Sequence, residues 1–179
     1  MDIFLLGILI LINGVFAMSE MAVVSSRKAR LQNLADDGSL GAEAALSLHQ
    51  EPSSFLSTIQ VGITSVGILS GAVGEAALAD PLAAWLAGMP PLAPYAKSVA
   101  LTITVIALTY FSVVVGELVP KRLAMLAPEG IASLIARPMM FLAKVTHPLV
   151  VVLSGSSTAI LSLLGARRKE EPPVTDDEI

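Results

Sequence analysis

Three long hydrophobic stretches, residues 3–25, 53–78 and 98–119, occupy most of the first two thirds of the chain. Each holds about the 20 apolar residues that an α-helix needs to cross the hydrocarbon core of a bilayer. Most of the charged residues lie outside these stretches rather than within them. The pattern therefore predicts an all-α membrane protein with three transmembrane helices.

Residues 123–165 are hydrophobic too, but prolines and bases interrupt them. The interrupting residues are Pro128, Pro138, Pro148, Arg137 and Lys144. Because proline breaks the interior of a helix, we expect short juxtamembrane helices along the cytoplasmic interface, with residues 149–164 half inserted or packed on protein. An ordinary fourth transmembrane helix is the alternative.

Basic residues predict the orientation of the helices. They follow the first and the third stretch, whereas the connection after the second stretch has a single base, Lys97. The bases after the first and third stretches are Arg27, Lys28, Arg30, Lys121 and Arg122. Since cytoplasmic connections are rich in Lys and Arg, we expect the N-terminus outside and the C-terminus in the cytoplasm.

The connections have features of their own. Residues 41–50 are rich in Ala, Leu and Glu, which predicts a short amphipathic helix at the membrane interface. Residues 81–94 form a proline-rich linker that contains Trp85 and is followed by Tyr95. Trp and Tyr at this position are typical of the aromatic belt of membrane proteins.

Composition agrees with the membrane class and argues against catalysis. The chain is 54% hydrophobic and 15% charged, whereas soluble domains carry roughly 25% charged residues. It has no cysteine, and its two histidines, His49 and His147, lie far apart in sequence. No phosphate-binding loop and no metalloprotease motif is present. We therefore predict that the protein is not an enzyme.

Glu117 lies at the end of the uncharged run 98–116, where an ionisable side chain is costly and usually serves a function. Pro120 has no amide hydrogen and clashes with the carbonyl of Gly116, four residues back. The freed carbonyl and the carboxylate are a pair of hard oxygen donors suited to Mg²⁺, Ca²⁺ or Na⁺. The alternative is a proline helix stop with Glu117 paired to Lys121.

The first stretch carries a second deep acid, Glu20, together with Asn13 and Ser19. Asn13 and Glu20 are seven residues apart and share a helix face, while Ser19 points about 100° away from Glu20. The Ser19 hydroxyl is a candidate ion ligand; alternatively it bonds its own helix carbonyl four residues back. Glu20 is either functional or structural.

The second stretch combines small residues with hydroxyls. Gly67 and Gly71 form a GxxxG pair, which Gly74 extends, and we interpret these glycines as helix-packing positions. Thr64 and Ser70 add uncharged oxygens to the same stretch.

Several segments together closely resemble the membrane domain of the CorC / cyclin M (CNNM) family of magnesium transporters. They are Asn-Gly-Val-Phe-Ala-Met-Ser-Glu-Met-Ala at 13–22, Ser-Arg-Lys-Ala-Arg-Leu at 26–31, Thr-Ile-Gln-Val-Gly-Ile-Thr at 58–64, Gly-Ile-Leu-Ser-Gly-Ala at 67–72 and Gly-Glu-Leu-Val-Pro-Lys at 116–121. The resemblance implies a homodimer in the lipid bilayer, three spans per copy with juxtamembrane helices, and cytosolic CBS modules beyond this chain. Residues 1–166 are then the ion-transport domain, and 167–179 a flexible linker towards those modules.

The resemblance also implies function and ligands. It implies Mg²⁺ export across the plasma membrane, here the bacterial inner membrane, with Na⁺ entry as the driving gradient and no nucleic-acid partner. The family's Gly-Glu-x-x-Pro motif falls on Gly116, Glu117 and Pro120, with Glu117 as the expected Mg²⁺ ligand. Ser19 and Ser70 are the candidate Mg²⁺ ligands at places where relatives have hydroxyl and asparagine ligands. Residues with a possible ion-coupling or structural role are Asn13, Glu20, Thr64 and Pro120. The alternatives are a Mg²⁺-sensing anchor and a transporter of another divalent cation.

Overall fold

The computed structural model describes residues 2–50 and 52–163, and this part of the chain contains helices and short loops but no strand. The predicted all-α class is confirmed. The α-helices are α1 (Asp2–Ser25), α2 (Lys28–Asp36), α3 (Leu40–Gln50), α4 (Pro52–Gly74), α5 (Asp80–Ala87), α6 (Ala96–Val113), α7 (Val119–Leu126) and α8 (Pro128–Leu163). Two π-helices, η1 (Glu75–Ala79) and η3 (Val114–Leu118), and the 3₁₀ turn η2 (Ala93–Tyr95) connect them. The expected linker 167–179 lies outside the described residues.

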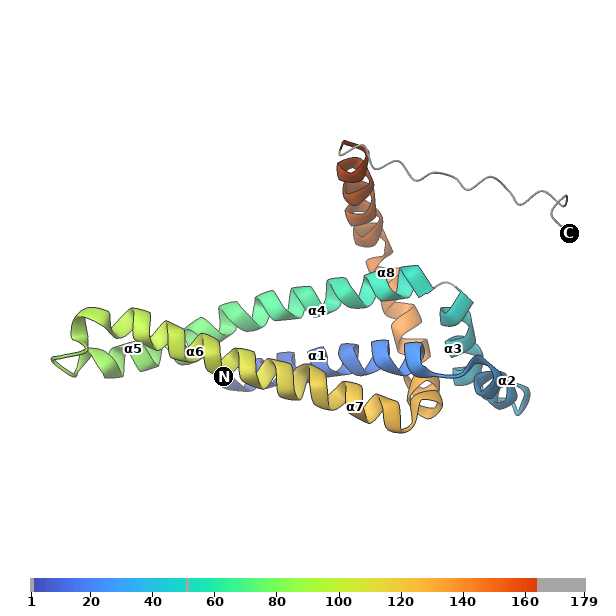
Figure 1. Cartoon of the computed structure of the whole chain (residues 1–179), viewed down its shortest axis with the longest axis horizontal. Helices are drawn as coiled ribbons and strands as arrows, with labels where there is room; N and C mark the ends of the chain where they lie inside the picture. Colours follow the sequence, from blue (N-terminus) through green and yellow to red (C-terminus); the bar gives the residue numbers. More distant parts are fainter. Residues whose placement is uncertain (1, 51, 164–179) are drawn as a thin grey trace, which may run out of the picture.

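Four helical units in the described part of the chain are long and apolar enough to cross a membrane. They are Asp2–Ser25, Pro52–Ala87, Ala93–Leu126 and Pro128–Leu163. The first three contain the predicted spans and run side by side, whereas α8 lies across them (Figure 1). A helix that crosses its neighbours in this way is oriented as a juxtamembrane helix would be. The count of three spans and the orientation of the termini stay predictions.

The prediction that prolines divide residues 123–165 into short pieces was wrong, since α8 continues through Pro138 and Pro148. A proline removes one hydrogen bond and disturbs one turn, and α8 offsets this loss by packing against α1, α3 and α4. At Gly41 a side chain would overlap the backbone of Ser133, so α3 and α8 touch backbone to backbone.

Pro120 does not end the helix of the third span, so the proline helix stop given as the alternative at Glu117 was wrong. The proline-rich linker after the second span is largely helical. The helix continues from η3 into α7 and from η1 into α5, with a proline at the start of each following helix. In the two π-turns the amide of Val119 bonds the Val114 carbonyl and the amide of Asp80 bonds the Glu75 carbonyl, each five residues back. The wider turn accommodates a proline that an ordinary α-helix would not.

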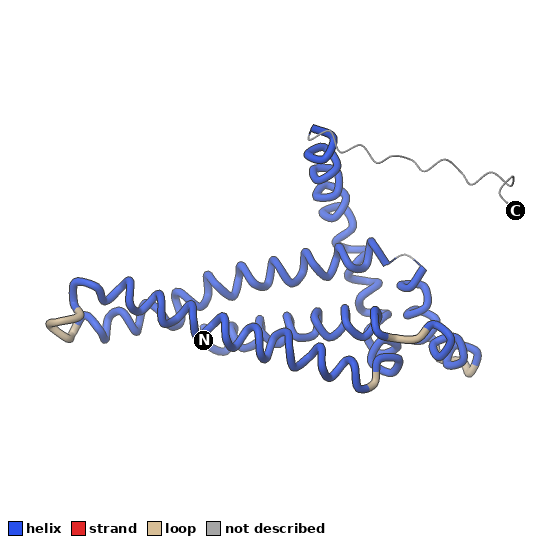
Figure 2. The backbone as a smooth tube through the Cα atoms, in the orientation of Figure 1, coloured by secondary structure: helices blue, strands red, loops and turns tan. Residues whose placement is uncertain are grey.

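The main core lies at one end of the molecule, where α2, α3 and the first half of α8 pack under α1 and α4. The predicted amphipathic helix at 41–50 is confirmed as α3. Figure 2 shows that loops occur only at the ends of the helices. Many large apolar side chains elsewhere are exposed, among them Ile3 and Ile106, as expected for a surface that faces lipid.

The glycines of the second span pack differently from expectation. A side chain at Gly74 would overlap Leu108 on α6, so this position is a helix contact as predicted. At Gly67 and Gly71 a Cβ would meet no atom within 4 Å. Within this chain Gly67 and Gly71 are not helix contacts, so the packing prediction for them stays a prediction, and the GxxxG pair is open to its surroundings.

Candidate cation site

The helix α1 and the π-turn η3 approach each other through two glycines. A Cβ on Gly14 would lie 3.0 Å from Pro120 Cγ and 3.4 Å from the Val115 carbonyl oxygen. A Cβ on Gly116 would lie 3.3 Å from the Ile10 carbonyl oxygen. Small residues allow this close contact between helices in a membrane. We call this contact the α1–η3 seam.

Asn13 closes the seam by a hydrogen bond from its Nδ2 to the carbonyl oxygen of Gly116, at 3.1 Å. This is the carbonyl that Pro120 deprives of its helical partner, so the predicted free acceptor exists and the asparagine satisfies it. The other amide atom, Asn13 Oδ1, is buried and has no hydrogen-bond partner in the described part of the chain. A buried oxygen without a donor is costly and rare, and it marks a place where a cation or water would be stabilised.

Two carboxylates meet one ammonium group at the cytoplasmic end predicted for the seam. Lys121 Nζ lies 2.9 Å from Glu117 Oε1 and 3.5 Å from Glu20 Oε2. The ion pair between Glu117 and Lys121, which was the alternative interpretation, is therefore present, and Glu20 joins it from α1. The three side chains are partly exposed, at 44%, 29% and 37% for Glu117, Lys121 and Glu20. Their formal charges leave the cluster with one unneutralised negative charge.

Ser19 is fully buried, and its hydroxyl donates to the Val15 carbonyl oxygen at 2.6 Å. This is the bond to its own helix that the alternative interpretation described. The lone pairs of the hydroxyl oxygen remain as acceptors, so its predicted role as a ligand stays a prediction.

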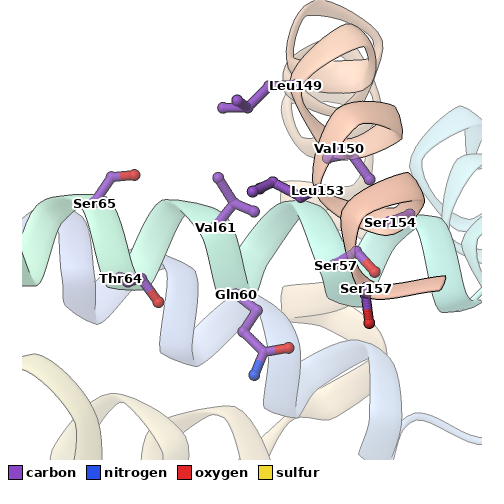
Figure 3. A pocket seen from close by; sticks show the side chains of 10 residues that line it. All are labelled: Ser57, Gln60, Val61, Thr64, Ser65, Leu149, Val150, Leu153, Ser154 and Ser157. Carbon is purple, nitrogen blue, oxygen red and sulfur yellow. The ribbon is translucent and has the colours of Figure 1, made fainter. Parts of the chain in front are cut away.

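The seam does not include the two polar residues predicted on the second span. Ser70 lines a cavity between α4 and α6, with Thr104 on the opposite wall. Thr64 lines a different cavity of about 610 Å³ where α8 crosses α4. Figure 3 shows this second cavity, whose lining contains hydroxyls and the Gln60 amide but no charged side chain. The structure thus brings Gly116, Glu117, Glu20, Asn13 and Pro120 together, and holds Ser70 and Thr64 apart from them.

Sequence reasoning missed one deep acid, Glu75 in η1. The tripeptide Val73-Gly74-Glu75 repeats Val115-Gly116-Glu117, and a proline follows each, Pro81 six residues after Glu75 and Pro120 three residues after Glu117. Both glutamates fall in π-turns, which occur frequently at functional sites. The repeated tripeptide followed by proline was the signal in the sequence.

The architecture and these motifs agree with a comparison to protein families, in which the model for the cyclin M transmembrane N-terminal domain matches residues 4–179. The chain belongs to the cyclin M transmembrane domain family. The helices α1, α4 and α6 and the Gly-Glu-x-x-Pro turn of η3 are therefore parts of a cyclin M membrane domain.

Three similar proteins come from bacteria. The cyclin M domain described here is 47% identical over all of its 179 residues to the UPF0053 protein sll0260 of Synechocystis. It is 33% identical to the polyamine export protein of Salmonella typhimurium over 99% of the chain, and 31% identical to that of Escherichia coli over 96%. The chain spans about 40% of the length of these relatives: 40%, 40% and 38%.

Proposed function

We propose that this cyclin M domain is the membrane part of a cation exporter and that the α1–η3 seam binds the exported cation. The observation that carries the proposal is the convergence of Glu117 and Glu20 on one point from two different elements. Carboxylates placed together within a membrane protein are retained for ion or proton handling. The Lys121 ammonium neutralises one of them, and an exported cation would compete with it.

Mg²⁺ is the cargo that we propose first, with Na⁺ entry as the driving gradient. Mg²⁺ prefers carboxylate, carbonyl and water oxygens. The seam offers Glu117, Glu20 and the partnerless Asn13 Oδ1 within a short stretch of α1 and η3. Ser19 would add its oxygen from α1, whereas Ser70 would have to approach from a separate cavity as the site opens alternately to the two sides.

An organic polycation is the second candidate cargo. Two relatives that match nearly the whole chain carry the name polyamine export protein. The seam already holds a primary ammonium group, the Nζ of Lys121, between two carboxylates. A terminal ammonium of an aliphatic amine has the same charge and the same three donors.

Assembly and location complete the proposal. The open Gly67 and Gly71 positions on α4 are suited to close contact with a second copy, which supports the expected homodimer. We place the protein in the bacterial inner membrane, with cytosolic CBS modules following in the longer protein. A Mg²⁺-sensing anchor for such modules is the alternative of another class.

Flux from liposomes that contain the purified chain tests the proposal. Mg²⁺ efflux down its gradient, raised by an opposing Na⁺ gradient, is the expected result, and Glu117→Gln reduces it at least about tenfold because the site loses its charge. Glu43→Gln, which changes an exposed acid on α3, is the control and leaves the flux unchanged. Mg²⁺ binding without flux would instead support the sensing role, and flux of diamines but not of Mg²⁺ would establish the second cargo.

A further inference from the structure

A cavity of about 440 Å³ lies between α4 and α6, and Glu75 is the one ionisable side chain that lines it. Ser70 lies on the same wall as Glu75, and Thr104, Val105 and Leu108 lie on the opposite wall. None of the seam residues lines this cavity. The Glu75 cavity is therefore a second candidate polar site, separate from the seam and located between membrane helices.

Glu75 is an exposed residue of the second span, three residues before the predicted end of that span at residue 78. Its neighbour Gly74 packs directly against Leu108, which is eleven residues from Lys97 and nine from Glu117, the charges that flank the third span. At 1.5 Å per residue these charges are about 16 and 14 Å away along the helix, so the third span places no charged side chain beside Glu75. In the part of the chain that the structure describes, Glu75 forms neither an ion pair nor a hydrogen bond. A carboxylate on an apolar span needs a positive partner or a proton.

The cavity hydroxyls of Ser70 and Thr104 have no hydrogen-bond partner among the described residues, unlike several other hydroxyls in the membrane helices. Ser19, Thr102 and Thr146 donate to carbonyl oxygens of their own helices, as hydroxyls in membrane helices commonly do. Ser70 and Thr104 are 8% and 4% exposed, yet no hydrogen bond of either hydroxyl is found among the described residues. Two largely buried residues, Ser70 and Thr104, therefore present partnerless hydroxyls beside the unpaired carboxylate on the walls of one cavity.

We propose that the Glu75 cavity binds the primary ammonium group of a short aliphatic amine. An ammonium group has one positive charge and three hydrogen-bond donors. The cavity supplies one carboxylate and the hydroxyl oxygens of Ser70, Thr104, Thr109 and Ser112 to receive them, and the apolar side chains of Val105 and Leu108 would contact the methylene groups.

A bare metal ion is a poorer occupant of this cavity. It needs six or more oxygens at 2.0–2.6 Å, whereas this wall is largely apolar and the volume far exceeds that of one ion. The same chain holds an ammonium group on carboxylates elsewhere, at Lys121. The inference deepens the second candidate cargo and rests on it, since an amine bound between membrane helices is useful to a protein that exports amines.

Calorimetric titration of the purified chain with 1,4-diaminobutane tests the site. Glu75→Gln keeps the shape of the side chain and removes its charge, so the affinity falls at least about tenfold, as when a charge-assisted hydrogen bond is lost. Thr104→Val, which replaces the hydroxyl by a methyl group, weakens binding several-fold. Glu43→Gln on α3 is the matched control. In a second control, Na⁺ replaces choline at constant ionic strength and does not displace the diamine.

Three outcomes would overturn the inference. One is equal affinity of the parent chain and Glu75→Gln, with circular dichroism showing that both are folded. Another is loss of diamine binding in Glu117→Gln but not in Glu75→Gln, which places the amine at the seam. The third is an altered oligomeric state of Glu75→Gln with unchanged affinity, which makes this face a contact between copies. In the proposed function Mg²⁺ flux depends on Glu117, whereas this inference concerns diamine binding at Glu75. Flux and binding are measured separately, so failure of the inference is distinguishable from failure of the proposed function.

Discussion

Lys121 belongs to both interpretations of the deep acid Glu117, because it is a structural partner and also a competitor for any incoming cation. Its Nζ lies 2.9 Å from one carboxylate and 3.5 Å from the other. These ion pairs are partly exposed, and exposed pairs contribute little to stability. The lysine can therefore be displaced at small cost, which is what a transport site requires of its resident charge.

Replacing Lys121 by Gln is expected to tighten Mg²⁺ binding by about tenfold. In the parent chain the fraction of molecules with a free pair of carboxylates limits the apparent affinity, and removal of the competitor raises that fraction. Isothermal titration with Mg²⁺ measures the effect. Arg122→Gln is the control, since Arg122 is the neighbouring base and forms no ion pair with the described residues. Weaker Mg²⁺ binding in Lys121→Gln would show that the lysine supports the site instead of competing for it.

Single residues were predictable from the sequence where one local rule decides them. The proline at 120 frees the Gly116 carbonyl by its chemistry alone, and the spacing of Glu117 and Lys121 allows their ion pair. The partner of that carbonyl, Asn13, comes from 103 residues away, and no local rule finds it. Glu20 joins the cluster for the same reason, since only the packing of α1 against η3 and α7 brings it there.

At the scale of helices, the sequence predicted well which segments form the long helices, but it predicted poorly where those helices end. The three spans and α3 follow from runs of apolar residues, which determine helices in a membrane strongly. The sequence did not predict that the helices continue through Pro81, Pro120, Pro138 and Pro148. A π-turn or a packed neighbour removes the penalty that proline imposes on an isolated helix. Proline marks a bend or a bulge here, not an end.

The glycine contact of the α1–η3 seam gives a prediction with its control on the same helix. Gly14→Ala places a Cβ 3.0 Å from Pro120 Cγ, so α1 and η3 must move apart, and overpacking of this kind costs about 1–3 kcal/mol. Gly7→Ala on α1 meets nothing within 4 Å and gains about 1 kcal/mol of helix propensity. Thermal unfolding of the purified variants is expected to show a lower midpoint for Gly14→Ala and an equal or higher midpoint for Gly7→Ala. Equal midpoints for Gly14→Ala and the parent would mean that the seam is loosely packed.

At the scale of the whole molecule, length and composition do not decide whether α8 crosses the membrane or lies along it. It is long and apolar enough to cross a bilayer, yet it lies across the three helices that run side by side (Figure 1). Its first half packs on α3 and contributes Ala132, Ile135, Ala136 and Met139 to the main core. We therefore expect both ends of α8 to lie on one side of the membrane.

Cysteine labelling decides this point cleanly, because the chain has no cysteine of its own. Gly130→Cys at the start of α8 and Ser162→Cys near its end are exposed positions, and both are expected to react with a membrane-impermeant maleimide from the cytoplasmic side only. Ala93→Cys in the loop between α5 and α6 serves as the opposite reference and reacts from outside. The physical reason is that a juxtamembrane helix lies along the interface, where neither end has to pass the hydrocarbon core. Labelling of Gly130→Cys and Ser162→Cys from opposite sides would make α8 a fourth span and would place the C-terminus outside.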